Sequence, residues 1–542
     1  MVRQLCYNVG RAAQGLPASG SVAGAFPRAF LRLRQTEEPG AGTTAPVRGK
    51  KGDEPMRTCW MILLVSLGWA PVSSAVVPRP QKMTRAPGFC AADVQPRETR
   101  DATIAAEGYR LTITPDAIEI ASADAAGAAY ARETLRQLAA EHGTVPCGTV
   151  EDAPKYAWRG LMVDEARHFF GKAAIRDVLD RMARDKMNVF HWHLVDDQGW
   201  RLEIRRHPEL VAAGATRPES VAYGGRSRRQ PDGSYTFPLD GRPYGPYFYT
   251  QDDIREILAY AKARHIRVVP EIELPGHERA LLAAHPELSC LGEKLPRVPR
   301  TYWSIEEDVL CAGNDATLRL LEEIFDEVCD LFAESPVIHL GGDECPKTRW
   351  KACAKCQARI RAENLKDEKA LQAWMVSHFV RYLEAKGRRA IGWDEILGGD
   401  VPKSAIAMAW RLPTPERRDG IWPAEIARRG FDFVATPRNP CYLDYAQGLA
   451  SDPYAYYSDR VNSLEQCLAF DPGAGVAAAD RAHILGGQGN CWSESTQDHH
   501  ELVWKTWPRA SALAEALWSG PGRDVADFRR RLAVRAAPPS RP

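Results

Sequence analysis

Residues 337–344 read VIHLGGDE, a short apolar run that passes into two glycines and then into two adjacent acids. Similar apolar and β-branched runs occur at 160–166, 188–197, 266–274, 388–396, 405–410, 431–437 and 483–492. Short, almost continuous apolar runs are typical of strands that are buried on both faces of a parallel sheet. The sequence therefore predicts eight such strands.

The segments between these runs have the spacing of amphipathic helices. Apolar residues recur every three or four positions in 173–187, 252–265, 316–332 and 368–387, whereas the segments after the fifth and seventh runs are weakly marked. Strands that alternate with helices are typical of parallel βα units. We therefore predict an α/β fold, a (β/α)8 TIM-type barrel over residues 154–520.

A different pattern precedes the barrel. Polar and apolar residues alternate in 108–124, as in a strand with one buried face, and 125–143 returns to helical spacing. We expect a small α+β domain over residues 76–153. Residues 521–542 are expected to form a C-terminal tail.

The first 75 residues are not expected to belong to the fold. Residues 1–55 are rich in Gly, Ala, Pro and Arg, lack a sustained period and are interpreted as an upstream extension. In residues 56–75, Arg57 is followed by an apolar run and then by the small residues Ser73 and Ala75, the layout of a secretory signal peptide. The alternative is a buried core helix, but no amphipathic pattern surrounds the run. We predict export, to the periplasm, the medium or an organelle lumen.

The charge balance narrows the class of ligand. The 542 residues contain 71 Lys and Arg against 70 Asp and Glu, a formal net charge of +1. Binding to a nucleic-acid backbone needs a concentration of basic residues, so we expect no nucleic-acid partner. No second hydrophobic span follows the first, and a neutral ligand is favoured.

The number of cysteines bears on the disulfides that the chain can form. Of the 13 cysteines, Cys6 and Cys59 would be removed with the leader, which leaves an odd number in an oxidising compartment. Cys290 and Cys311 flank a Pro-rich excursion. They are interpreted either as a disulfide that closes this loop or as unpaired buried thiols.

Two groups of residues are candidates for binding a metal. Cys345, Cys353 and Cys356 form C-x7-C-x2-C, which is typical of a structural zinc site, although the sequence does not identify the fourth ligand that zinc requires. His191 and His193 share one face of the second predicted strand and are candidate ligands of a metal-dependent hydrolase.

Polar and aromatic residues gather at the C-terminal ends of the predicted strands. They are Asp164, Asp196, Asp197, Glu271, Glu273, Asp343, Glu344, Trp393, Asp394, Trp410, Trp492 and Glu494. In a barrel these ends converge on the face where barrel enzymes keep their chemistry. Flat aromatic rings pack against the apolar face of a sugar, so acids combined with tryptophans indicate a carbohydrate ligand.

The adjacent acids Asp343 and Glu344 restrict the mechanism. Two like charges on neighbouring residues raise the pKa of one of them, as a general acid near neutrality requires. Neighbours about 3.8 Å apart at Cα cannot easily flank a glycosidic bond as an acid and a carboxylate nucleophile do. The 2-acetamido oxygen of the substrate is therefore the candidate nucleophile, with Glu344 as the acid and Asp343 holding the amide.

At this point the chain resembles a known family. Over residues 76–520 it is similar to glycoside hydrolase family 20, the β-N-acetylhexosaminidases, whose members use substrate-assisted catalysis. The motifs that carry the resemblance are VVPRPQ, WRGLMVDEARHFF, HWHLVDDQGWRLEI, VVPEIELPGHERA, HLGGDECP, GWDEI, WSE and WPRASALAEALWS.

The resemblance implies a role for each matching residue. Glu344 corresponds to the general acid and base and Asp343 to the residue that orients the acetamido group, with Asp196 and His277 supporting them. The expected substrate-binding residues are Arg159, Trp393, Trp410, Tyr442, Asp444, Trp492 and Glu494. Among these, the tryptophans would enclose the acetamido group, Tyr442 would donate to its oxygen, and Arg159, Glu494 and Asp444 would bind sugar hydroxyls.

The implied activity is that of an exo-acting, retaining hydrolase that removes terminal β-linked N-acetylglucosamine or N-acetylgalactosamine without a catalytic cofactor. Alternatives are a member of the family that releases disaccharides or acts on sulfated sugars, and a non-catalytic sugar-binding barrel. The insertion at 198–250 is expected to form loops near the mouth of the site. The natural glycan and the oligomeric state stay open.

Overall fold

The computed structural model describes residues 75–225, 228–229, 235–413, 420–448, 452–454, 460–521 and 524–536. The predicted signal peptide at 56–75 falls outside these ranges except for Ala75, and the predicted upstream extension falls outside them entirely. Along the described ranges, none of the helices combines the length and the apolar character needed to cross a bilayer.

The described barrel strands number eight, pair in parallel throughout and form a closed ring, as predicted. They are β6 (Trp158–Asp164), β7 (Val189–His193), β12 (Arg267–Glu271), β13 (Val337–His339), β14 (Arg389–Trp393), β15 (Ile406–Ala409), β16 (Phe433–Ala435) and β17 (Ile484–Cys491). The last strand pairs with the first, with Gly487 opposite Arg159 and Cys491 opposite Val163. Each strand is buried on both faces, which explains why it was recognisable as an apolar run.

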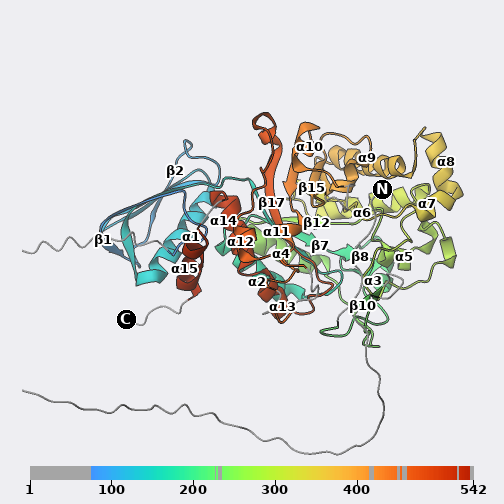
Figure 1. Cartoon of the computed structure of the whole chain (residues 1–542), viewed down its shortest axis with the longest axis horizontal. Coiled ribbons are helices and arrows are strands. Elements are labelled where there is room, and N and C mark those ends of the chain that lie inside the picture. The colour runs from blue at the N-terminus through green and yellow to red at the C-terminus, as the bar shows by residue number, and fades with distance from the viewer. Residues whose placement is uncertain are drawn as a thin grey trace, which may run out of the picture. The chain divides into compact units, whose positions relative to one another are not determined.

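The outer layer contains the four predicted helices and several shorter ones (Figure 1). The longer helices are α2 (Gly171–Arg184), α4 (Gln251–Lys262), α6 (Asp315–Leu331), α9 (Glu368–Ala385) and α14 (Arg509–Ser519). The shorter ones are α3 (Glu209–Gly214), α5 (Arg279–Ala284), α7 (Thr348–Ala352), α8 (Ala354–Ala362), α10 (Pro423–Arg428), α11 (Arg438–Cys441), α12 (Leu464–Leu468) and α13 (His499–Thr506). Two-residue strands β8 (Val195–Asp196), β9 (Gly199–Trp200), β10 (Arg228–Arg229) and β11 (Tyr235–Thr236) lie in the connection between β7 and α4.

Local sequence explains where these helices begin. Thr250 and Asp253 form a reciprocal capping box at α4, and Asn314 and Asp367 accept backbone hydrogen bonds at the starts of α6 and α9. In their described residues, the weakly marked segments after the fifth and seventh strands contain two 3-10 helices, Asp394–Gly398 and Ala478–His483, and the short helices α11 and α12.

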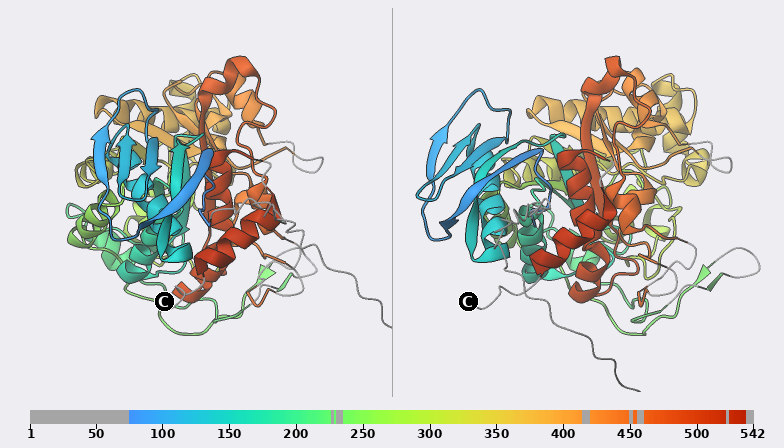
Figure 2. Two further views of the ribbon diagram at one scale, coloured as in Figure 1. Left: turned by 90° about the vertical axis from the view of Figure 1, so that its left-hand side faces the viewer. Right: turned by 60° about the vertical axis from the view of Figure 1, so that its left-hand side comes forward.

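The small α+β domain is a five-stranded sheet covered by one helix, as predicted. Its elements are β1 (Lys82–Ala91), β2 (Arg97–Arg100), β3 (Tyr109–Ile113), β4 (Ile118–Ser122), α1 (Ala125–His142) and β5 (Thr144–Asp152), in the sheet order β1-β5-β3-β4-β2. Trp518 of α14 completes its apolar core and donates a 2.8 Å hydrogen bond to Asp152. Figure 2 shows the C-terminal helices, in red, beside this domain.

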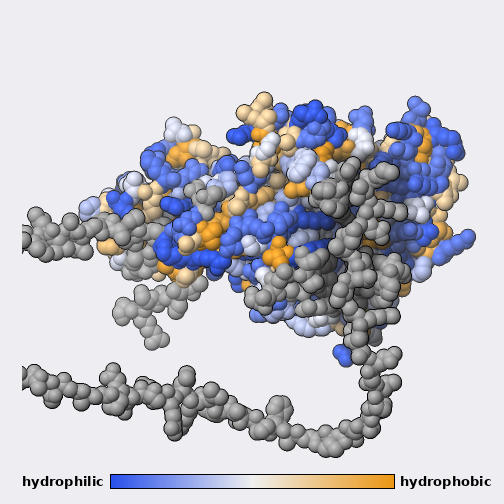
Figure 3. Space-filling view, in the orientation of Figure 1, coloured by the Kyte–Doolittle hydropathy of each residue, from blue (hydrophilic) through white to orange (hydrophobic). Residues whose placement is uncertain are grey.

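The segment expected to be a tail contains a helix, α15 (Val525–Ala536). Its Phe528 and Arg531 are buried, and Arg531 binds Glu515 of α14 and the carbonyl of Val76. The helix was underestimated because its sequence is rich in arginine and only a narrow stripe of it is apolar. The face of the molecule seen in Figure 3 is mostly hydrophilic, with scattered apolar residues.

Candidate active site

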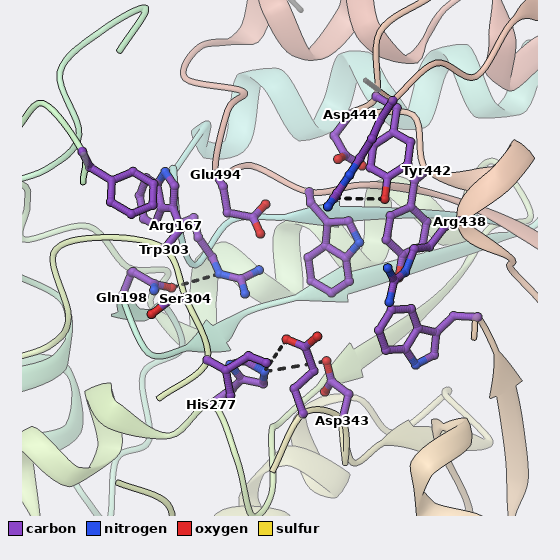
Figure 4. Close-up of a pocket in the computed structure, with 17 residues that line it drawn as sticks. Arg167, Gln198, His277, Trp303, Ser304, Asp343, Arg438, Tyr442, Asp444 and Glu494 are labelled. Atoms are coloured by element: carbon purple, nitrogen blue, oxygen red, sulfur yellow. Dashed lines mark hydrogen bonds and ion pairs between the residues drawn. The ribbon is translucent and has the colours of Figure 1, made fainter. Parts of the chain in front are cut away.

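A cavity of about 450 Å³ lies at the C-terminal ends of the barrel strands (Figure 4). This volume is in the range of about 300–1,000 Å³ that is usual for small-ligand sites. Its walls come from segments that follow at least five of the strands. They include Arg167 after β6, His277 after β12, Asp343 after β13, Trp410 after β15 and Trp492 after β17.

The loop after β13 directs the two adjacent acids into this cavity. Gly341 and Gly342 adopt φ angles of 60° and 103°, and a Cβ on Gly341 would lie 1.6 Å from a carboxylate oxygen of Glu273. Only glycine fits this turn. It brings Asp343, which is nearly buried, and Glu344, which is more exposed, to the cavity side by side.

His277 lies against both acids. Its Nε2 is 3.8 Å from an oxygen of Asp343 and 3.8 Å from an oxygen of Glu344, while its Nδ1 is 3.1 Å from Asp197 and 3.5 Å from Asp196. Burial opposes a charge on this ring, but the Asp196 and Asp343 carboxylates raise its pKa well above the usual value. His277 is therefore a buried cation between two pairs of acids, and Figure 4 shows it beside Asp343.

The pKa of Asp343 is raised. Its burial, together with the charge of Glu344, raises the pKa of this carboxyl to about 7, against the lowering effect of His277. The sequence predicted a raised pKa within the pair but associated it with the general acid Glu344. Burial is the largest cause of the raised pKa of Asp343.

A buried ionic network supports the site from inside the barrel. Glu271 binds His193 at 2.5 Å and accepts a 2.9 Å hydrogen bond from the indole of Trp393. His193 contacts Asp196 at 3.1 Å, and Asp196 in turn binds Arg167 at 2.7 Å. Burial disfavours the cation of His193, but Glu271 and its other acidic neighbours raise its pKa to about 10.

This network accounts for the histidines considered as metal ligands. His191 and His193 both contact Glu271 in the barrel interior, and neither lines the cavity. Their position favours a supporting role over a hydrolytic metal centre that must reach the substrate.

Three aromatic residues form one wall of the cavity. The rings of Trp410 and Tyr442 are nearly parallel with centroids 6.2 Å apart, and Trp492 lies 6.1 Å from Tyr442. Trp393 packs behind this wall, 5.6 Å from Trp492, and does not itself line the cavity. The wall is an aromatic surface of the kind that binds a sugar ring or an acetamido methyl group.

Buried polar atoms face the cavity from several sides. Among the described residues, Asp343 Oδ1, Asp444 Oδ1, Trp492 Nε1 and Trp303 Nε1 are buried without a protein hydrogen-bond partner. Burial and the charge of Glu494 raise the pKa of Asp444 to about 7. Because buried polar groups are ordinarily paired, these atoms are the natural contacts of a polar ligand.

The structure corrects the prediction for Arg159. This arginine is the second residue of β6, at the opposite end of the strand from the cavity. It is fully buried against Glu107 at 2.8 Å and the carbonyls of Tyr156 and Lys186. Arg167, eight positions later and past the C-terminal end of the strand, lines the cavity instead.

Arg167 is held rigidly at the cavity. It binds Asp164 at 3.0 Å, Asp196 at 2.7 Å and Gln198 at 2.9 Å, and its guanidinium lies 5.1 Å from the ring of Trp492. Figure 4 shows Glu494 beside it. The sequence could have distinguished Arg167 from Arg159, because in a barrel only the C-terminal end of a strand faces the site.

Loop residues that sequence reasoning missed complete the cavity. Phe237, from the insertion predicted to lie near the mouth, stacks on Tyr302, and Trp303 and Ser304 follow in the excursion after β12. Arg438 lies over the ring of Trp410 at 4.4 Å. No local pattern distinguishes such loop residues, since their position depends on long-range packing.

The structure agrees with the second interpretation of Cys290 and Cys311, as unpaired thiols, but it arranges the predicted three-cysteine group differently. All eleven that lie in the described ranges are free, so Cys290 and Cys311 form no disulfide there. Cys353 and Cys356 meet these two cysteines rather than Cys345, whose sulfur contacts the carbonyl of Pro346. The predicted three-cysteine group is therefore wrong in one member, because Cys345 turns toward the cavity loop beside Gly276.

An acid pair that faces an aromatic wall at this end of the barrel defines a sugar-processing (β/α)8 protein. Comparison with known proteins makes the assignment specific. The chain belongs to glycosyl hydrolase family 20: the model of the family's catalytic domain matches residues 156–521, and the model of its domain 2 matches residues 75–153.

Individual relatives agree with this assignment. A beta-hexosaminidase of Porphyromonas gingivalis is 39% identical over 440 residues, which cover 79% of this chain and 52% of that protein, so the chain spans about half of its length. A beta-hexosaminidase of Akkermansia muciniphila is 34% identical, over 80% of this chain and 83% of the relative. The exo β-N-acetylglucosaminidase of Vibrio harveyi, solved with N-acetylglucosamine, is 27% identical with a TM-score of 0.72, over 85% of this chain and 76% of that one.

Proposed function

We propose that the protein is an exo-acting, retaining β-N-acetylhexosaminidase that removes terminal β-linked N-acetylglucosamine or N-acetylgalactosamine from glycans. The observation that carries the proposal is the placement of Asp343 and Glu344 side by side in a cavity with an aromatic wall, both facing His277. The names of the relatives and the N-acetylglucosamine complex of the Vibrio harveyi protein support it.

The geometry favours attack by the substrate itself. An ordinary retaining glycosidase places its two carboxyl groups about 5–5.5 Å apart on opposite faces of the sugar. Here the acids are consecutive residues, and Asp196 is occupied below the cavity by Arg167 and His193. Burial raises the pKa of Glu494, and the adjacent Arg167 opposes this rise and holds the side chain in place. The acetamido oxygen of the substrate is left as the nucleophile.

The reaction then has two steps. The acetamido carbonyl oxygen forms a bond to C1 while the glycosidic C1–O bond breaks, and Glu344 gives its proton to the leaving oxygen. Asp343, as a carboxylate, accepts a hydrogen bond from the amide N–H and stabilises the oxazolinium ring. In the second step Glu344 takes a proton from water, whose oxygen attacks C1 and opens the ring. The sugar leaves with its original β configuration and Glu344 is protonated again.

The remaining cavity residues position the terminal sugar. Tyr442 would donate to the acetamido oxygen, and Trp410 and Trp492, with Trp393 behind them, would enclose its methyl group. Asp444 and Glu494 would accept hydrogen bonds from sugar hydroxyls. Arg167 would donate to them in the role that the resemblance assigned to Arg159. None of these steps requires a cofactor.

Two matched aryl glycosides test the proposal. The purified protein should hydrolyse an aryl β-N-acetylglucosaminide with a kcat/KM that exceeds that for the corresponding β-glucoside by orders of magnitude. Equal rates would remove the acetamido group from the mechanism. Faster turnover of a sulfated or disaccharide glycoside would assign the alternative specificities within the family, and no turnover of any of them would indicate a sugar-binding barrel.

A variant of the acid provides the second test. Glu344→Gln should lower kcat by about 10²–10⁴ for substrates with poor leaving groups while product binding is retained. Glu384→Gln, on the exposed face of α9, is the matched control and should leave both unchanged. Similar losses in the two variants would argue against Glu344 as the acid.

We also propose that the protein is exported, on the basis of the tripartite pattern at 56–75. N-terminal sequencing of the protein recovered from culture medium or from an isolated compartment should find a start near Val76. Recovery of an uncleaved chain from the cytoplasm alone would contradict this proposal.

A further inference from the structure

Four cysteines from two separate loops meet at one point outside the cavity. Cys290 and Cys311 flank the excursion between α5 and α6, whereas Cys353 and Cys356 lie at the start of α8. The sulfur of Cys311 is 3.7 Å from that of Cys353 and 3.6 Å from that of Cys356, and the sulfur of Cys290 is 3.8 Å from that of Cys356. All four sulfurs lie within 4.8 Å of one another.

These distances correspond to a tetrahedron of thiolates around one ion. Zinc–sulfur bonds of about 2.3 Å in tetrahedral geometry place the sulfurs about 3.8 Å apart. A disulfide requires about 2.05 Å. Moreover, Cys311 has two sulfur neighbours at almost the same distance, whereas a sulfur atom can form only one disulfide.

The surrounding backbone brings the two loops into direct contact. A Cβ on Gly313 would lie 2.2 Å from the carbonyl carbon of Lys355 and 2.4 Å from the nitrogen of Cys356, so only glycine permits this approach. Cys311 and Cys356 are buried, and Cys290 and Cys353 are partly exposed. The cluster is therefore enclosed by protein but close enough to the surface for an ion to enter.

We propose that Cys290, Cys311, Cys353 and Cys356 bind one structural Zn²⁺ ion through four thiolates. The C-x2-C pair at the start of α8 supplies two ligands, and the ends of the excursion supply the other two. Four sulfur ligands in a closed tetrahedron leave no position for substrate or water, which is characteristic of a structural rather than a catalytic zinc site.

The ion would link the excursion between Cys290 and Cys311, which forms one wall of the sugar cavity, to the start of α8, which follows the acid pair in the chain. The excursion between Cys290 and Cys311 carries Trp303 and Ser304, which line the cavity. Two other contacts already join the same segments: the indole of Trp350 donates to the carbonyl of Leu310 at 2.9 Å, and Arg349 binds Asp308 at 2.6 Å. Loss of the ion should loosen this wall and weaken substrate binding more than chemistry.

Metal analysis of the full chain tests the proposal directly. Protein purified without chelators or a metal-affinity tag should contain about one zinc per chain by mass spectrometry of the elements. Native mass spectrometry should find the mass of the zinc-loaded chain. A strong chelator should remove the ion, release four thiols to a thiol reagent and lower the apparent Tm by about 5 °C or more.

Matched cysteine variants locate the site. Cys353→Ser should lose the zinc and raise KM more than it lowers kcat, whereas Cys345→Ser, eight positions earlier and outside the cluster, should keep the full zinc content. If Cys353→Ser does not fold, the chelator titration of the unmodified chain still tests whether the cysteine cluster binds zinc. Three results would overturn the proposal. One is a zinc-free chain whose mass is about 4 Da below that of the reduced chain, because the four cysteines form two disulfides. The others are four freely reactive thiols in the untreated chain, and iron in place of zinc.

Discussion

His277 connects the acid pair to the buried charges below it. The residue has a φ of 54°, a conformation that non-glycine residues rarely adopt, and it is held there by Asp197 and Asp196. Its other nitrogen faces Asp343 and Glu344 at 3.8 Å. The imidazolium is thus placed to favour the ionised form of Asp343, which the proposed mechanism requires.

Removal of this cation should change the pH dependence. Burial and Glu344 raise the pKa of Asp343 to about 7, and His277 lowers it. In His277→Asn the pKa of Asp343 should therefore rise further, and the carboxylate should form only at higher pH. The acid limb of kcat/KM against pH should shift upward, by about one unit or more.

His378→Asn is the control for this shift, because His378 pairs with Glu322 on the outer helices and does not line the cavity. It should leave the pH profile unchanged. An acid limb that stayed in place in His277→Asn, with only kcat reduced, would show that His277 does not control the ionisation of Asp343.

Substitutions of the two arginines in residues 158–170 should affect different properties, catalysis for Arg167 and stability for Arg159. Arg167→Lys removes a rigid fork of donors at the cavity and should reduce kcat/KM by about 10- to 100-fold. Arg159→Lys disturbs a buried pair with Glu107 and should lower the apparent Tm with little effect on KM. Steady-state kinetics and thermal unfolding of both variants check these two expectations. An increase in KM that is confined to Arg159→Lys would show that Arg159, and not Arg167, binds the substrate.

At the scale of elements, α15 joins the barrel to the start of the small domain. Arg531 is buried and binds Glu515 of α14 at 2.6 Å, Asp527 at 2.8 Å and the carbonyl of Val76 at 2.9 Å. Both members of the Arg531–Glu515 pair are almost inaccessible to solvent. Breaking such a pair leaves a buried charge without compensation.

Arg531→Met should therefore destabilise the protein by about 3–5 kcal/mol, measured as a loss of free energy of unfolding in denaturant. Catalysis should be unaffected, since α15 does not contribute to the cavity. Arg530→Met, on the exposed side of the same helix, should cost less than about 1 kcal/mol. Equal losses in the two variants would exclude the buried pair as the cause.

Sequence patterns predict those elements whose signal is local. The eight strands were recognisable because both of their faces are buried, and α4 and α9 carry apolar spacing together with N-terminal caps. Helix α15 was not recognised, because its sequence is rich in arginine and Arg531, which is buried in the structure, has the sequence character of a surface residue. The grouping of the cysteines was also missed, since 66 residues separate Cys290 from Cys356 and only the tertiary fold brings them together.

At the scale of the whole molecule, the barrel gathers residues that are far apart in the chain. His277, Asp343, Trp410 and Trp492 each follow a different strand, and closure of the ring brings them to one cavity. The motifs with strand-end acids and tryptophans could be placed from sequence, because the rule that the C-terminal face carries the chemistry applies to all of them. Trp303 and Phe237 could not be placed from sequence, because no comparable rule relates the sequence of a long loop to its position at the cavity.

The central claim is that the substrate's acetamido oxygen, oriented by Asp343, attacks C1. A series of aryl β-glucosaminides whose N-acetyl group carries zero, one, two or three fluorine atoms tests it most directly, because each fluorine makes that oxygen a weaker nucleophile. We predict that kcat/KM falls progressively across the series, by orders of magnitude in total. A kcat/KM that is independent of fluorine content, together with a covalent sugar ester on a protein carboxylate, would contradict the account.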